Sequence, residues 1–122
     1  MASYPELTGQ RLQRKDDPAV YLIMDGVRRH IPNVWTFDRL CRDRSTTEAI
    51  MLDEIDEGPP ISDGALLAKD PGTDPVWFID HSLQQKRHIS DVAMDKYNFS
   101  WDRIEAVSNF VLDAIPTGSD IL

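Results

Sequence analysis

Two arginine–histidine pairs are the clearest candidates for ligand binding in this chain. Arg29-His30 and Arg87-His88 each follow a run of β-branched and aromatic residues. A guanidinium group forms paired hydrogen bonds with a carboxylate or a phosphate, so an acidic sugar or another carboxylate ligand could bind there. The competing interpretation, which we favour, is that both arginines form structural ion pairs. The candidate acidic partners are Asp25, Asp80, Asp53 and Asp113.

Aromatic side chains accompany these pairs and suggest a second kind of contact. Tyr21 and Trp77 occupy corresponding positions, and Trp101 follows a polar loop. An exposed aromatic ring offers an apolar face to the C–H groups of a sugar, although an aromatic residue within a strand usually packs in the core. Trp101 is the one expected to be exposed. The candidate ligand-binding residues are therefore Tyr21, Arg29, His30, Trp77, Arg87, His88 and Trp101.

The common catalytic and metal-binding signatures are absent from the sequence. There is no His-Glu-x-x-His, Gly-x-Ser-x-Gly or Gly-x-Gly-x-x-Gly motif, and no two histidines are spaced for a local metal site. We therefore expect no metal, no cofactor and no enzymatic activity. Cys41, the single cysteine, is expected to pack in the interior, because a thiol needs a neighbouring base to act as a nucleophile. The acidic run 53–57 is expected to be solvated.

The elements that position these residues occur in two copies. The matching blocks are 20–23 with 76–79, 29–31 with 87–89, Val34 with Val92, and 52–55 with 112–115. The offset between the copies only grows along the chain, as insertions in the loops of the second copy would require. We therefore predict a single domain, residues 1–122, made of repeat one at 8–61 and repeat two at 63–122.

Each repeat is predicted to be a three-stranded antiparallel element followed by short helices. Residues 20–24 and 76–79 have the β-branched and aromatic composition of strands, and Asp25-Gly26 suits a type I′ hairpin turn. Both faces of these middle strands are apolar, so each strand should be covered on two sides. Leading strands are expected at 66–68 and, more weakly, at 11–13. Helices are expected at 34–41 and 92–97, capped by Asn33 and Asp91, with second helical segments near Thr46 and after Ser100.

The fold class is therefore α+β, with two related halves packed in pseudo-twofold symmetry. A unit of this size cannot easily bury both faces of its own sheet, so the halves should complete each other's cores. A propeller-like arrangement, in which two chains supply four blades, is the alternative.

The repeated phrases also resemble a known family. Residues 20–32 (Val-Tyr-Leu-Ile-x-Asp-Gly-x-x-Arg-His-Ile-Pro) and 112–118 (Leu-Asp-x-Ile-Pro-x-Gly) are similar to a tandem repeat of uncharacterised bacterial secreted or surface proteins, where copies often sit beside hydrolase domains. The resemblance extends from about Gly9 to Leu122 and implies a non-catalytic accessory or adhesive module. It transfers no catalytic residues. It implies an extracellular or surface location, and without it a cytoplasmic one is expected.

Composition excludes several other classes. The chain has 122 residues and a formal net charge of −8, so its overall field repels nucleic acid and anionic membranes. No apolar run approaches the roughly 18–20 residues of a membrane span. The opening Met-Ala-Ser-Tyr-Pro-Glu lacks the features of a signal peptide.

The function predicted from the sequence is a non-catalytic binding module that recognises glycan or cell-wall material. Two alternatives stay open. One is a structural or assembly protein that forms a homodimer or binds a partner protein. The other is a small hydrolase with a site between the halves, drawing on two of these residues: His30, His81, His88, Asp53 and Asp113.

Overall fold

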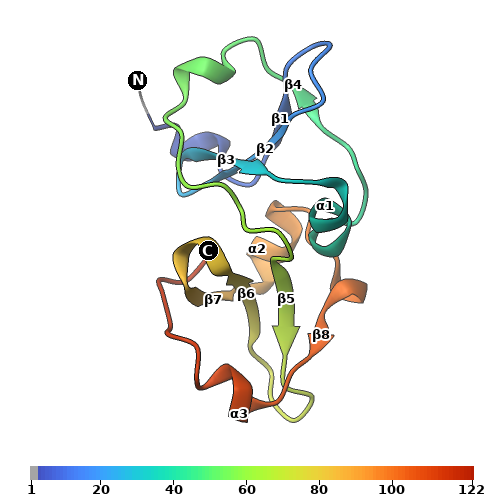
Figure 1. The fold of residues 1–122 in the computed structure, drawn as a ribbon, viewed down its shortest axis with the longest axis vertical. Coiled ribbons are helices and arrows are strands. Elements are labelled where there is room, and N and C mark those ends of the chain that lie inside the picture. Colours follow the sequence, from blue (N-terminus) through green and yellow to red (C-terminus); the bar gives the residue numbers. More distant parts are fainter. Residues whose placement is uncertain (1–2) are drawn as a thin grey trace.

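The computed structural model describes residues 3–122, which form two four-stranded sheets and short helices (Figure 1). The first sheet has the order β3-β2-β1-β4 and the second the order β7-β6-β5-β8, so the two strand orders correspond. The expected α+β class is confirmed. The strands are β1 (Arg11–Gln13), β2 (Val20–Met24), β3 (Val27–Ile31), β4 (Thr47–Glu48), β5 (Leu66–Lys69), β6 (Val76–Asp80), β7 (Gln85–Ile89) and β8 (Glu105–Ala106).

The fourth strand of each sheet corrects the sequence-based prediction of three strands. β4 and β8 run parallel to β1 and β5, whereas the other pairs are antiparallel. The helical segment predicted near Thr46 is wrong, because the chain there binds the edge of β1. Ala49 N–H donates to the Gln13 carbonyl at 3.0 Å, and the Thr46 hydroxyl lies 2.9 Å from the Gln13 side-chain oxygen.

Helical structure does follow Ser100, although in two pieces separated by β8. A 3₁₀ helix spans Trp101–Arg103 and α3 spans Asn109–Leu112. The other 3₁₀ helices are Pro5–Leu7, Leu52–Glu54 and His81–Leu83. No helix within residues 3–122 combines the length and apolarity needed to cross a bilayer.

The hairpin turns follow from local backbone preferences. Asp25 and Gly26 both have positive φ, at 57° and 80°, as the predicted type I′ turn requires. The second hairpin instead turns through the 3₁₀ helix His81–Leu83. The Asp80 carboxylate accepts a hydrogen bond from Ser82 N–H there, and Gln84 closes the turn in the left-handed region.

The two larger helices begin at side-chain caps. α1 (Val34–Leu40) is capped by Asn33, as predicted. α2 (Asp91–Lys96) is capped by Ser90, whose hydroxyl accepts from Ala93 N–H at 3.1 Å, so the expected cap at Asp91 is wrong. The caps lie 57 residues apart (90 − 33), because Pro32 adds a residue to the first connection. Val34 therefore does not occupy the helical position of Val92, and the steadily growing offset is interrupted here.

The main hydrophobic core is built from both halves of the chain. Leu22 and Leu40 from the first half pack in one cluster with Phe78 and Phe99 from the second. A smaller cluster containing Leu12, Ile23 and Leu52 covers the opposite face of the first sheet, where Tyr4 and Leu7 also pack. The predicted two-sided cover is thus confirmed for β2. For β6 it is only partial, because Trp77 and Ile79 remain half-buried.

The segment after each helical region returns to border its own sheet. Arg28 N–H donates to the Asp56 carbonyl and Gly58 N–H to the Arg28 carbonyl, both at 2.9 Å, so residues 56–58 run beside β3. Lys86 forms the same two bonds with Pro116 and Gly118 beside β7, at 2.8 Å. A Cβ atom at position 58 would lie 2.8 Å from Cγ2 of Val27, so only glycine permits this approach without a shift.

Candidate functional site

Each hairpin brings one predicted aromatic residue and one predicted histidine side by side. Tyr21 lies opposite His30 in the β2–β3 pair, with ring centroids 5.3 Å apart. Trp77 lies opposite His88 in the β6–β7 pair, with ring centroids 5.8 Å apart. The four side chains are half-buried. They come together as two separate aromatic–histidine pairs, one in each sheet.

A cation covers each of these aromatic rings. The Arg28 guanidinium carbon lies 5.1 Å from the centroid of Tyr21, and Lys86 Nζ lies 4.8 Å from that of Trp77. Both cations also bind the returning segments, since Arg28 donates to the Ile55 carbonyl and Lys86 to that of Ile115. Cation–π contacts of this kind stabilise the fold. They also occupy a ring face that a sugar would otherwise contact.

Arg29 and Arg87 form reciprocal ion pairs between the two halves. Arg29 Nη2 bonds the Asp80 carboxylate, and Arg87 binds Asp25 through two hydrogen bonds of 2.7 and 2.9 Å. Each Nε also donates to a backbone carbonyl of the returning segment, at 2.8 Å. The structural pairing with Asp25 and Asp80 is therefore confirmed. The alternative partner Asp53 instead bonds Arg14.

This pairing places both guanidinium groups inside the protein. Arg29 is 2% exposed and Arg87 is 3% exposed. Within residues 3–122, no buried side-chain nitrogen or oxygen lacks a hydrogen-bond partner. Arg29 and Arg87 therefore hold the halves together, and neither faces solvent where a ligand would bind.

Trp101 lies on the surface, as the sequence indicated. Its side chain is 45% exposed in the 3₁₀ helix Trp101–Arg103. Trp35, on α1, is more exposed still, at 78%. Trp101 does not line the cleft described next, so it stands apart from the histidines with which it was grouped.

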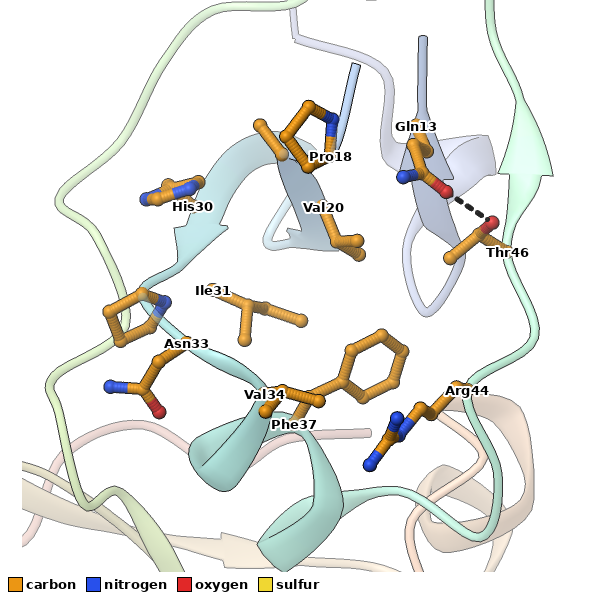
Figure 2. Close-up of a pocket in the computed structure, with 12 residues that line it drawn as sticks. Gln13, Pro18, Val20, His30, Ile31, Asn33, Val34, Phe37, Arg44 and Thr46 are labelled. Atoms are coloured by element: carbon orange, nitrogen blue, oxygen red, sulfur yellow. Dashed lines mark hydrogen bonds between the residues drawn. The ribbon is translucent and has the colours of Figure 1, made fainter. Parts of the chain in front are cut away.

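A cleft of about 480 Å³ opens beside His30 (Figure 2). We call it the His30 cleft. Its walls come from the start of β2, the end of β3, helix α1 and the loop that follows α1. Val20, Ile31 and Phe37 supply an apolar floor. The polar residues that line it are Gln13, Asn33, Arg44 and Thr46, while His30 borders it with its imidazole turned to the other face of β3, against Tyr21 (Figure 2).

The rim groups are held by hydrogen bonds. The Asn33 amide donates to Asp63 at 2.9 Å while its oxygen caps α1. Arg44 binds both oxygens of Asp38, at 2.9 and 3.0 Å. These hydrogen bonds hold the pKa of the Asp38 carboxyl below its ordinary value. The cleft is thus edged by positioned donors and acceptors.

The second half has a smaller cleft at the corresponding place. It has a volume of about 320 Å³ and is lined by Val76, His88 and Ile89, where the first cleft has Val20, His30 and Ile31. Its rim differs in charge, because Asp74 and Asp91 lie there and no arginine lines it. The two clefts are therefore lined by corresponding strand positions and differ in the charge of their rims.

Sequence reasoning found one wall of the His30 cleft and missed the opposite wall. Phe37, Arg44 and Thr46 were not singled out, because they lie in segments with no motif of their own. The available signal was the polar stretch 42–47 (Arg-Asp-Arg-Ser-Thr-Thr) directly after a predicted helix. Loops of this kind often carry binding residues on a rigid scaffold.

The residues named for the hydrolase alternative lie apart. Within residues 3–122, no hydrogen bond or ion pair joins any two of His30, His81, His88, Asp53 and Asp113. The same described residues contain no group of three His, Cys, Asp or Glu side chains placed to hold a metal ion.

Cys41 is buried at the end of α1, and burial raises the pKa of its thiol to about 12. We expect the folded protein to react with iodoacetamide at least about 100-fold more slowly than the unfolded protein, because the reactive thiolate is both scarce and inaccessible. The raised pKa also has a consequence for stability. The unfolded thiol ionises first, so stability falls as the pH rises from about 9 toward 12.

The measurement is alkylation followed by mass spectrometry, with denatured protein as the reference. The pH effect is checked by chemical denaturation of the wild type and of Cys41→Ala, whose alkaline loss of stability should be smaller. Rapid alkylation of the folded protein would contradict the expectation.

Comparison of the chain with protein-family models, with curated proteins and with solved structures finds no match.

Proposed function

We propose that this protein is a non-catalytic binding module whose ligand site is the His30 cleft. One observation carries the proposal: an apolar floor of Val20, Ile31 and Phe37 lies inside a rim of positioned polar groups. Clefts of about 300–1,000 Å³ with this division of apolar and polar surface are typical of small-ligand sites. The His30 cleft, at about 480 Å³, falls in that range.

The proposed ligand class is a saccharide of glycan or cell-wall material. A sugar ring presents C–H groups that pack against apolar side chains and hydroxyls that exchange hydrogen bonds with a polar rim. The guanidinium of Arg44 further suits a sugar that carries a carboxylate. The resemblance of residues 20–32 to repeats of bacterial surface proteins supports the same ligand class.

The candidate residues then have different roles. Arg44 contacts the ligand, whereas His30 borders the cleft with its imidazole on the other face of β3, against Tyr21. Arg29 and Arg87 hold the halves together. Trp77, His88 and Trp101 lie outside this cleft.

Titration with soluble saccharides tests the proposal. We expect a neutral or uronic-acid oligosaccharide to bind at micromolar to millimolar concentration and to shift NMR signals around residues 30–46. Replacing Arg44 with alanine should weaken binding about tenfold, the cost of one lost hydrogen bond in a ligand site.

Arg39→Ala is the matched control, because Arg39 is another exposed arginine that pairs with a carboxylate, that of Glu105, and it does not line the cleft. Its effect should be less than about twofold. If none of the saccharides binds at millimolar concentration, the proposed ligand class is wrong. Equal losses of affinity in the two variants would show that the ligand does not bind in the His30 cleft.

We further propose that the two halves are copies of one unit related by a pseudo-twofold axis. The identical strand orders support this, as do the reciprocal bonds from Arg29 and Arg87. An antiparallel bridge also joins Cys41 to Phe99, where the two helices end. An antiparallel bridge has local twofold symmetry, so the axis would pass between these two residues.

A further inference from the structure

A second apolar depression lies along β4, away from the His30 cleft. This groove, which we call the β4 groove, has a volume of about 770 Å³. Leu7 and Leu12 line its inner side, and Ile50 and Met51 stand at its opening. Ile50 is 94% exposed and Met51 is 37% exposed, so two neighbouring apolar side chains are open to solvent at the groove.

The groove follows an open edge of the first sheet. β4 is the last strand in the order β3-β2-β1-β4, and both of its residues are exposed. The other edge is bordered by residues 56–58, which bond to β3. β4 also lies at the end of the molecule that points away from the second sheet (Figure 1). An open edge of this kind can pair with an added strand.

The charge of the groove indicates which kind of segment could pair with β4. Glu48, Asp53 and Glu54 line it, and none of its lining residues is a lysine or an arginine. Asp53 is bonded to Arg14, whereas both glutamates are exposed. The whole chain has a charge of −8, so a second copy would be repelled and a cationic segment attracted.

We propose that the β4 groove binds an extended segment of a partner protein that carries apolar and basic residues on the same side. The segment adds to β4 as a further strand. Ile50, Met51, Glu48 and Glu54 all line one groove, and every second side chain of a strand points to the same side. Residues two positions apart in the segment therefore supply the apolar contact to Ile50 and Met51 and the Lys or Arg that approaches the glutamates.

The test is to pan a displayed library of random short peptides against the full chain, and then to measure a synthetic copy of the enriched sequence by fluorescence polarisation. We expect enrichment of peptides with an apolar and a basic residue two positions apart, and binding that weakens as salt is added. Ile50→Ser should weaken binding about tenfold, the loss of one buried aliphatic contact. Joint replacement of Glu48 and Glu54 by glutamine should flatten the salt dependence.

Phe110→Ser is the matched control, since Phe110 is 89% exposed beyond the corresponding strand β8 and does not line the groove. Its peptide affinity should equal that of the wild type. The proposal is overturned if no sequence is enriched, if a glutamate-substituted peptide binds equally well, or if both serine variants lose the same affinity. Concentration-dependent dimerisation in sedimentation, abolished by Ile50→Ser, would instead assign the groove to a second copy.

Discussion

Replacing Arg29 with alanine is expected to lower the free energy of unfolding by about 3–5 kcal/mol, the usual cost of removing one partner from a buried ion pair. The side chains of Arg29 and Asp80 are 3% and 1% exposed, so the substitution would leave a carboxylate without its cation inside the protein. It would also remove the donor to the Pro59 carbonyl. Urea denaturation followed by tryptophan fluorescence measures the change.

The chain provides its own control in Arg87→Ala. Arg87 is equally buried, but the side chain of its partner Asp25 is 59% exposed and can be hydrated after the substitution. The loss should therefore be smaller, about 1.5–3 kcal/mol, as for lost hydrogen bonds to a charged group. A double variant, Arg29→Met with Asp80→Asn, should recover much of the stability, because no buried charge is left unpaired and the amide oxygen at position 80 can still accept from Ser82 N–H. If Arg29→Ala costs no more than Arg87→Ala, burial of the Asp80 carboxylate does not govern the effect.

Phe99→Ala is expected to be comparably damaging, by about 3–5 kcal/mol, because it opens a cavity where the two halves meet. Phe99 is fully buried, and its ring stacks on Tyr97 at 5.2 Å and on Phe78 at 6.0 Å between centroids. Since the same cluster includes Leu22 and Leu40 from the first half, both sheets should unfold together. Hydrogen exchange should show protection falling in β2 as well as in β6.

Phe110→Ala removes the same side chain from an exposed position, so its effect should stay within about 0.5 kcal/mol. Two separate transitions in the wild type, with Phe99→Ala moving only one of them, would show that the halves fold independently. A single transition that moves as a whole is the expected result.

The sequence predicted the local structure well where one segment carries its own signal. The β-branched runs of β2 and β6, the positive-φ turn at Asp25-Gly26 and the cap at Asn33 depend on neighbouring residues alone. The errors occur where the decisive partner is distant. Thr47 and Glu48 form a strand only because β1 lies beside them, which no local propensity reports.

In the candidate site, too, the features set by neighbouring residues were predictable and those set by distant residues were not. The burial of Arg29 and Arg87 could be anticipated from the alternation of side chains along a strand, and their acidic partners were among those considered. The identity of each pair could not, because Arg29 reaches a residue 51 positions away and Arg87 one 62 positions away. The His30 cleft was missed for a similar reason, since α1 and the loop at Arg44 close it from outside the hairpin.

The reciprocal ion pairs also determine where the chain can be lengthened. Hairpin tips usually accept extra residues most readily, but here Asp25 and Asp80 at the two tips are each tied to an arginine of the other half. An epitope tag or a domain inserted at either tip would therefore strain the ion pair that joins the two halves. The exposed stretch 71–74 between β5 and β6 has no such tie and is the natural point for an insertion.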